Sequence, residues 1–227
     1  MTAAEQDADA EAQRQKYRDV LVQSAGGYLR NVVRTPQVSC SVCATFVEPQ
    51  YDTCHRCKVH RDRHGDRLAD LVVPLTYGVK DAQSGHMMRR YKAPVPGDAN
   101  SWVRLTLTSG LLTHGRCVTK VIGARYGTRL TVPSLSTSRV GVHPLTQITT
   151  KLGLTNADLV LQPVEGAIKS TEARTGVFTV SDPSKVAGRH VMIIDDTWAS
   201  GGSAQSAALR YGTQGRSSSR SLLLPGG

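Results

Sequence analysis

The clearest strand signal in the chain is the apolar run Val191–Ile194. Three of its four residues are β-branched, as is typical of a strand buried on both faces of a parallel sheet. A helix-compatible run follows at Ala204–Arg210. Shorter apolar runs at Leu68–Pro74 and Leu130–Val132 predict further strands, and Ile148–Leu154 predicts a helix. The pattern therefore predicts an α/β domain whose mostly parallel sheet is flanked by helices.

Other parts of the middle of the chain give weaker patterns. Tyr77–Lys92 is expected to contain a helix that ends in a basic cluster. Apolar and polar residues alternate poorly in Val103–Leu112 and Val118–Ile122, which predicts a mixture of strand and helix there. Leu159–Leu161 is interpreted as a strand.

The two ends of the chain look unlike its middle. Residues 1–13 are acidic and polar and are expected to be disordered, whereas Tyr17–Ser24 fits one face of a helix. Residues 213–227 form a Ser/Arg-rich, low-complexity tail that is poorly suited to a core strand. Leu222–Leu224 could still form a very short strand, but a divergent or damaged tail would leave the sheet without an edge.

Composition narrows the class of protein. Of 227 residues, 39% are hydrophobic, and no apolar run reaches the roughly 18 residues that a membrane helix requires. The first residues do not have the basic region followed by an apolar region that is typical of a secretory signal peptide, so we expect a cytoplasmic protein without membrane contact. The formal net charge of +10 favours anionic partners, either phosphorylated metabolites or nucleic acid.

Four of the five cysteines form two CxxC pairs separated by ten residues. In a reducing compartment this spacing predicts a tetrahedral zinc site, and with no ligand to spare its role is expected to be structural. The ligands would be Cys40, Cys43, Cys54 and Cys57. The nearby His55, His60 and His64 are expected on a solvated basic surface. Cys117 is expected to be a small buried residue.

Two carboxylates and a loop of small residues follow the predicted strand Val191–Ile194. Ligands of open α/β sheets bind at the carboxyl ends of strands, where glycines admit a ligand and a helix start attracts phosphate. Asp195 and Asp196 can accept hydrogen bonds from a vicinal diol and help to hold hydrated Mg²⁺. The stretch therefore predicts a site for a phosphorylated sugar, and an ordinary strand-to-helix turn is the alternative. Trp198 could pack or could stack on a base.

This stretch resembles the phosphoribosyl-pyrophosphate (PRPP) motif of type I phosphoribosyltransferases. The motif has four apolar residues, two acidic residues and a small-residue loop. The resemblance implies that Asp195 and Asp196 contact the ribose diol and that Mg²⁺ accompanies PRPP. It implies that the 5-phosphate is bound by Thr197, Ala199, Ser200, Gly201, Gly202 and Ser203. Relatives that act on 6-oxopurines carry an Asp where Ala199 stands, so that acid/base group is absent here.

A second loop, called here the serine loop (residues 133–139), follows the predicted strand Leu130–Val132. In the family a loop at this place binds pyrophosphate through backbone amides and a basic residue. Ser134, Leu135 and Ser136 occupy that place, and Arg139 supplies the charge. Arg139 thus joins the two aspartates as a catalytic candidate. A Ser/Thr-rich surface loop is the alternative. Lys169 and Arg174 are further candidate phosphate partners or plain surface residues.

The order of the parts resembles ComF-type proteins, in which a four-cysteine zinc finger precedes a phosphoribosyltransferase core. Tyr77–Lys92 is similar to the segment that joins them, and Glu172–Val180 resembles the strand that leads up to the PRPP motif in the family. The division implied is an N-terminal tail and helix (residues 1–37), a small zinc-ribbon-like part called here the four-cysteine module (38–66), a phosphoribosyltransferase-like domain (67–212) and the tail (213–227).

The resemblance implies transfer of the phosphoribosyl group between PRPP and an unidentified acceptor. Two other functions stay open from sequence. One is a non-catalytic protein that binds PRPP or a nucleotide, because fold does not fix function. The other is an accessory protein of DNA uptake that binds nucleic acid. The sequence predicts neither the acceptor nor the oligomeric state.

Overall fold

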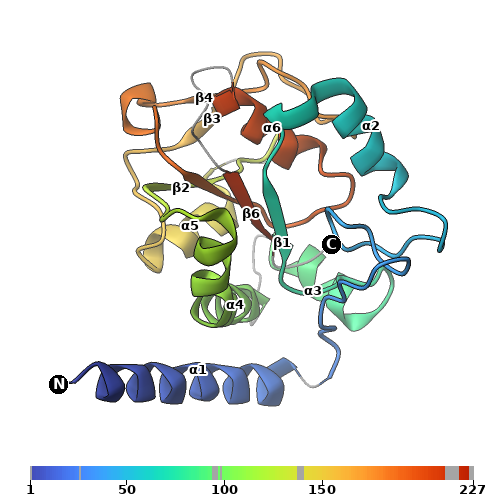
Figure 1. Cartoon of the computed structure of the whole chain (residues 1–227). Coiled ribbons are helices and arrows are strands. Elements are labelled where there is room, and N and C mark those ends of the chain that lie inside the picture. Colours follow the sequence, from blue (N-terminus) through green and yellow to red (C-terminus); the bar gives the residue numbers. More distant parts are fainter. Residues whose placement is uncertain are drawn as a thin grey trace.

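A four-stranded parallel sheet forms the centre of the computed structural model (Figure 1). Its strands lie in the order β1 (Leu71–Pro74), β6 (Arg220–Leu224), β5 (Val191–Ile194) and β2 (Thr128–Thr131). The structure describes residues 2–25, 27–93, 97, 99–136, 141–212 and 220–224. The expected mixed α/β architecture with a parallel sheet is confirmed, and β5 begins and ends at the predicted residues.

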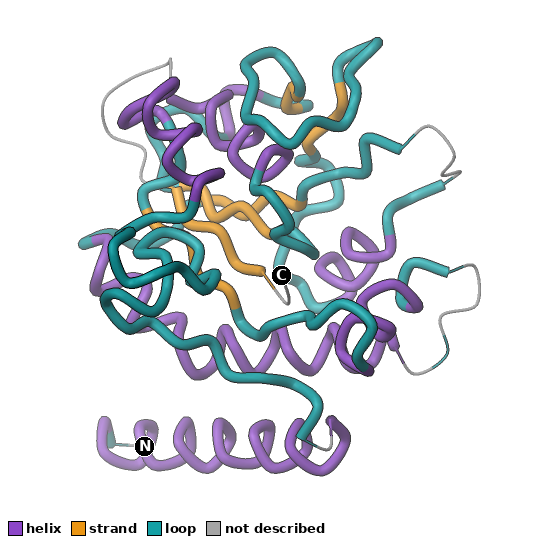
Figure 2. Tube along the Cα trace, turned by 90° about the vertical axis from the view of Figure 1, so that its right-hand side faces the viewer, coloured by secondary structure: helices purple, strands orange, loops and turns teal. Residues whose placement is uncertain are grey.

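Alternating residues of β5 face two separate cores. Val191 and Ile193 point into one core, whereas Met192 and Ile194 point into the other, as the period of two in a strand requires. The sheet therefore lies between two layers (Figures 1 and 2). The first layer holds α6 (Gly202–Gly212) and the antiparallel hairpin of β3 (Leu161–Pro163) and β4 (Phe178–Val180). The second holds α3 (Gln83–Arg90), α4 (Ala99–Ile122) and α5 (Pro144–Lys151).

The four-cysteine module packs on the first face of the sheet. Its helix α2 (His55–His64) leads into the short 3₁₀ turn η1 (Gly65–Arg67), and a second such turn, η2 (Pro183–Lys185), precedes β5. The buried cysteines of the module share a core with Val72 of β1 and with Val191 and Ile193. The module is therefore continuous with the hydrophobic core of the sheet.

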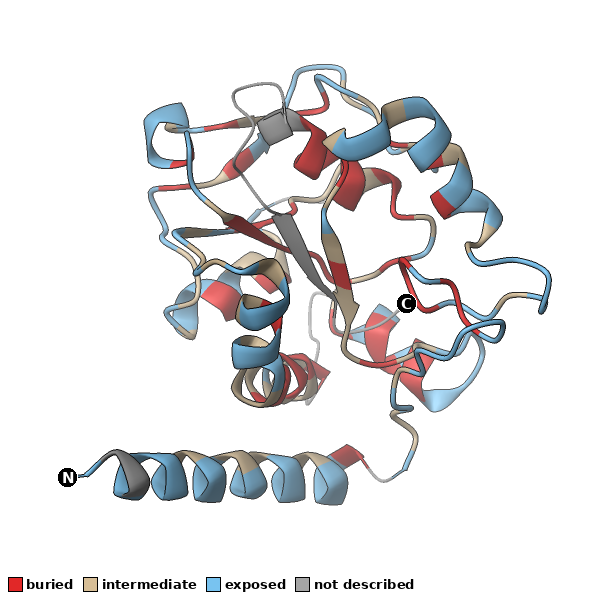
Figure 3. Cartoon of the chain, in the orientation of Figure 1, coloured by how far each residue is buried: buried red, intermediate tan, exposed pale blue. Residues whose placement is uncertain are grey.

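Helix α1 (Ala3–Ala25) corrects the expectation of disorder near the N-terminus. Thr2 and Glu5 form a reciprocal capping box: the Thr2 N–H donates to Glu5 Oε2 at 2.6 Å, and the Glu5 N–H donates to Thr2 Oγ1 at 3.3 Å. Alanine, glutamate and glutamine also have high helix propensity. The helix runs beside α4, where Arg116 pairs with Asp7 at 3.2 Å, and stays largely exposed (Figure 3).

Helix α4 is one continuous helix where the sequence predicted a mixture of strand and helix. Its buried face includes the polar or small residues Thr106, Ser109 and Gly110 beside Val103 and Leu107, which hides the helical period from an apolar pattern. Cys117 lies on the exposed side of α4, so the expectation of burial is wrong. None of the helices in the described ranges is both long enough and apolar enough to cross a membrane.

Strand β6 corrects the expectation for the C-terminal tail. It lies inside the sheet, with Leu71 paired to Ser221 on one side and Val191 paired to Arg220 on the other. A strand with a neighbour on both sides is held by backbone hydrogen bonds that do not depend on its side chains. The predicted short strand at Leu222–Leu224 is therefore confirmed within β6. The expectation that the tail leaves the sheet without an edge strand is wrong.

Candidate functional site

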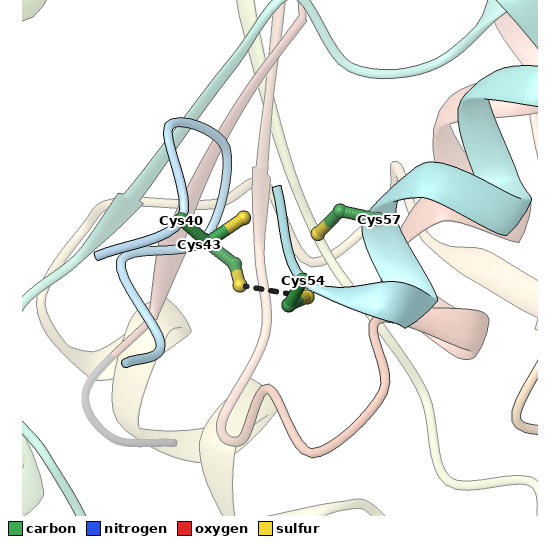
Figure 4. A group of neighbouring side chains, drawn as sticks. All are labelled: Cys40, Cys43, Cys54 and Cys57. Atoms are coloured by element: carbon green, nitrogen blue, oxygen red, sulfur yellow. Dashed lines mark hydrogen bonds between the residues drawn. The ribbon is translucent and has the colours of Figure 1, made fainter. Parts of the chain in front are cut away.

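The four predicted zinc ligands meet at one point (Figure 4). Their sulfur atoms all lie within 4.8 Å of one another, and Cys43 Sγ is 3.8 Å from Cys54 Sγ. A tetrahedral site with Zn–S bonds of about 2.3 Å places its sulfurs about 3.8 Å apart. A disulfide would require about 2.05 Å. The cluster therefore has the donor set and the spacing of a metal site.

Local backbone structure aims these sulfurs. In the first pair the Cys40 N–H donates to the Thr45 carbonyl at 2.8 Å, and Ala44 adopts a φ of +62°, which closes a tight knuckle. In the second pair Cys54 is the N-cap of α2 and Cys57 lies in its first turn, so both project toward the knuckle.

The four thiols compete for protons in this cluster. A hydrogen bond with Cys43 lowers the pKa of Cys40 below its usual range. A hydrogen bond with Cys40 raises the pKa of Cys57 above its usual range. A bound cation resolves the competition because it stabilises every ligand as a thiolate. The residues present thus fit a metal ion such as zinc.

Two histidines of the module dock it onto the rest of the chain, so the predicted solvated location is wrong for His60, which is buried, and only partly right for His64, which is half-buried. His60 is 2% exposed, and its Nε2 lies 3.2 Å from the Thr171 carbonyl oxygen. His64 Nε2 lies 2.8 Å from the Ala173 carbonyl oxygen. His55 is exposed, as predicted.

A pocket of about 180 Å³ lies where β2 and β5 end at the carboxyl edge of the sheet. Much of its wall comes from two segments that are far apart in sequence, the described part of the serine loop (residues 133–136) and the segment after β5, and Lys92, His143 and Lys169 also line it. The Val132 N–H donates to the Ile194 carbonyl at 2.9 Å, which carries the pairing of the two strands up to the pocket. The position matches the edge at which open α/β sheets bind ligands.

Most predicted binding residues line this one pocket. From the serine loop they are Ser134, Leu135 and Ser136, and from the segment after β5 they are Asp195, Asp196, Thr197, Ala199, Gly201 and Ser203. Ser200 and Gly202 stand beside it, and the Gly202 N–H lies 3.4 Å from Ser200 Oγ. Arg139 lies outside the described residues.

Three side chains converge on one oxygen of Asp196. Lys92 Nζ lies 2.8 Å from Asp196 Oδ2, His143 Nε2 lies 3.3 Å from it, and the Tyr91 hydroxyl donates to it. Burial alone would raise the pKa of Asp196, but the hydrogen bond from His143 and the charge of Lys92 hold that pKa well below its usual range. Asp196 is therefore a stably ionised carboxylate.

The neighbouring Asp195 has the opposite electrostatics. It is buried, and its Oδ1 accepts the Asp196 N–H at 2.8 Å. Burial first, and then repulsion by Asp196, raise the pKa of Asp195 well above its usual range. Two adjacent carboxyl groups with divergent pKa values are a frequent feature of functional sites.

Trp198 and Gly201 shape the loop after β5. Trp198 is 5% exposed and belongs to the core, so it packs inside the protein. Gly201 has a φ of +77°, and a Cβ at this position would lie 2.3 Å from Trp198 Cζ2. Only glycine fits that turn, which delivers the chain to the start of α6.

Sequence reasoning missed the residues that surround Asp196. Tyr91 and Lys92 follow α3, and His143 is the N-cap of α5. The Nδ1 atom of His143 accepts the Leu145 N–H at 3.2 Å. A neutral imidazole that accepts at Nδ1 carries its proton on Nε2, which suits donation to Asp196. The only sequence signal was the position of Lys92 at the end of the predicted basic cluster. Lys169, which the sequence suggested either as a phosphate partner or as a plain surface residue, lines the pocket.

No family model, no curated protein and no solved structure matches this chain.

Proposed function

We propose that the protein binds PRPP with Mg²⁺ and transfers the phosphoribosyl group to or from an acceptor, as a ComF-type member of the type I phosphoribosyltransferases. One observation carries the proposal. The two loops to which the family resemblance gives pyrophosphate and 5-phosphoribose come from separate segments and line one pocket beside an acidic pair. The parallel pairing of β2 and β5 brings the two loops together, and the residues that they present there are of the kinds that bind phosphates and ribose hydroxyls.

Each wall of the pocket suits one part of PRPP. Gly201 and the first residues of α6 offer backbone N–H groups and a helix dipole to the 5-phosphate. The ionised Asp196 accepts hydrogen bonds from ribose hydroxyls, and the serine loop faces the pyrophosphate. Lys92 and Lys169 add positive charge at the same pocket. Catalysis would come from positioning and from charge stabilisation of an oxocarbenium-like transition state.

Both metals of the proposal fit the residues present. Mg²⁺ takes oxygen ligands, which the acidic pair and the ligand would supply, and when bound it neutralises the charge of the departing pyrophosphate. Zn²⁺ would occupy the four-cysteine cluster in a closed, structural site. Thiolate ligands of this kind persist in a reducing compartment, which favours the cytoplasm.

Calorimetric titration of PRPP with Mg²⁺ tests the proposal. Wild type is expected to bind, and the double variant Asp195→Asn, Asp196→Asn is expected to lose binding. The matched control is Asp9→Asn, Asp19→Asn, which makes the same two substitutions on the exposed face of α1. A well-folded wild type that does not bind would refute the proposal. Binding without pyrophosphate release in a screen of nucleobases would favour a non-catalytic PRPP sensor.

A basic surface favours nucleic-acid binding as a second candidate function. A hollow of about 590 Å³ borders α4 and the amino end of β2, on the edge of the sheet opposite the pocket. Four of its lining residues are basic and none is acidic: Arg116, Lys120, Arg125 and Arg129. Arg116 also pairs with Asp7.

The salt dependence of DNA affinity tests this second function. The exchange Lys120→Glu, Arg125→Glu should weaken binding to single-stranded DNA and flatten its dependence on salt, because each phosphate contact adds to that slope. PRPP binding should stay unchanged. A DNA affinity that is already absent in wild type at low salt would exclude this function.

A further inference from the structure

Helix α2 holds three consecutive residues of a distant loop. His60 and His64 contact the backbone of Thr171 and Ala173, and Arg63 forms an ion pair with Glu172. Hydrogen bonding to Arg63 lowers the pKa of Glu172, so this pair is charged on both sides. The same helix begins at the metal cluster, because Cys54 caps it and Cys57 lies in its first turn. The metal cluster and the loop are thus joined by one rigid element.

The loop held by α2, called here the strap (residues 168–174), also borders the pocket. Lys169 lines the pocket, and its charge acts on Asp195. The Ser170 carbonyl oxygen lies 2.3 Å from the point where a Cβ of Gly202 would stand, so the strap is packed directly on the start of α6. The Arg174 N–H donates to Ser206 Oγ at 2.9 Å. Any movement of the strap therefore moves Lys169 and the wall of the pocket at the start of α6.

We propose that metal in the four-cysteine cluster sets the affinity of the pocket for its phosphorylated ligand, and that His60 is the positioning residue that transmits this effect. The inference rests on the proposed PRPP site, because it concerns the affinity of that site. The metal orders the start of α2, α2 fixes the strap through His60, and the strap presents Lys169. Loss of the metal frees the strap without removing any residue of the pocket.

The chemistry of His60 explains why it is the point to test. Its Nε2 lies 3.2 Å from the Thr171 carbonyl oxygen and 3.3 Å from the Ala173 nitrogen. A single ring nitrogen can serve one of these groups at a time, while Nδ1 is buried with no hydrogen-bond partner among the described residues. Glutamine has both a donor and an acceptor, so His60→Gln can satisfy the strap, and His60→Ala cannot.

The experiment compares wild type, His60→Ala and His60→Gln as full-length, zinc-loaded proteins. His55→Ala is the matched control, because His55 is an exposed histidine of the same helix. Three quantities are measured: zinc content by elemental analysis, amide hydrogen exchange of the strap, and PRPP affinity by calorimetry. Wild type is measured again after zinc has been removed with a chelator.

We expect His60→Ala to keep its zinc, to exchange the strap amides faster and to bind PRPP about tenfold more weakly, as is usual for coupled sites. His60→Gln and His55→Ala should match wild type. Zinc-free wild type should resemble His60→Ala at the strap. Unchanged exchange and affinity in both His60→Ala and zinc-free wild type would overturn the inference while leaving the proposed function intact. A folded wild type that does not bind PRPP would overturn both, and zinc lost from His60→Ala would assign His60 to metal retention instead.

Discussion

His143 Nε2 lies 3.3 Å from Asp196 Oδ2, the oxygen that Lys92 also contacts at 2.8 Å. The same imidazole caps α5 through its Nδ1. One histidine therefore joins the start of a helix to the floor of the pocket, and it fixes the carboxylate. The acidic pair is thus held in place from the second layer of helices as well as from its own strand.

The raised pKa of Asp195 predicts that Asp195→Asn stabilises the folded protein. Above the ordinary carboxyl pKa near 4 the unfolded chain loses this proton while the folded chain keeps it, so stability falls as pH rises through that window. The variant removes this penalty and should melt roughly 2–5 °C higher than wild type near pH 7.5. The difference should vanish near pH 4. Thermal melts across this range measure it, and an equal difference at every pH would contradict the prediction.

Lys92→Met should destabilise the protein far more than Lys58→Met. Lys92 pairs with a carboxylate whose side chain is 9% exposed, whereas Lys58 and Asp62 are 65% and 61% exposed. Removing Lys92 leaves a buried carboxylate with less compensation, which should cost roughly 1–3 kcal/mol. Loss of the exposed pair should cost below about 0.5 kcal/mol. Chemical denaturation gives the free energy of unfolding of both variants. Equal losses would show that burial does not strengthen the Lys92–Asp196 pair.

Gly201→Ala should destabilise the protein, and Gly115→Ala should stabilise it. An alanine at 201 would need a φ of +77° and would place its Cβ 2.3 Å from Trp198, at a cost of roughly 1–3 kcal/mol. Gly115 lies within α4, and an added Cβ would meet no atom within 4 Å beyond its chain neighbours and the adjacent backbone of the helix, so alanine should add about 0.5–1 kcal/mol. Denaturation midpoints of the two variants measure the opposite signs. A gain at position 201 would mean that the turn is not as described.

Removal of metal should unfold residues 38–60 and lower the melting temperature of the whole chain. The cluster shares a core with β1 and β5, so its loss exposes apolar surface of the sheet as well. Circular dichroism before and after chelation measures the change. Cys43→Ser should retain less than the roughly one zinc per chain expected of wild type. Cys117→Ser, an exposed cysteine outside the cluster, should retain all of it. An unchanged melting curve after chelation would contradict the prediction.

Local patterns predicted the parts of the site that lie next to a strong strand. Val191–Ile194 was found at its predicted bounds because four consecutive apolar residues require burial on both faces. The loop after it then had to lie at the carboxyl edge of the sheet. The two CxxC pairs predicted their own meeting, since few other structures explain that spacing.

Contacts between distant segments could not be predicted in this way. Nothing in the sequence near Lys92 or His143 names Asp196 as their partner, because the contact depends on how α3 and α5 pack on the sheet. His60 looked solvated because charged neighbours surround it in sequence, although one face of α2 is buried. The sequence suggested only the short strand Leu222–Leu224, and the place of β6 inside the sheet was missed because backbone pairing with two neighbours holds a segment whose composition is unusual for a core.

The position of β6 has a consequence for folding. Parallel neighbours β1 and β5 are both joined to β6, so Leu71 has no sheet partner until Ser221 arrives. Such long-range pairings slow folding, because the entropy of closing a long loop must be overcome first. During synthesis on the ribosome, the backbone hydrogen-bonding groups of β1 would stay unpaired until β6 has been made. The protein should therefore rely on chaperones during synthesis more than its size suggests.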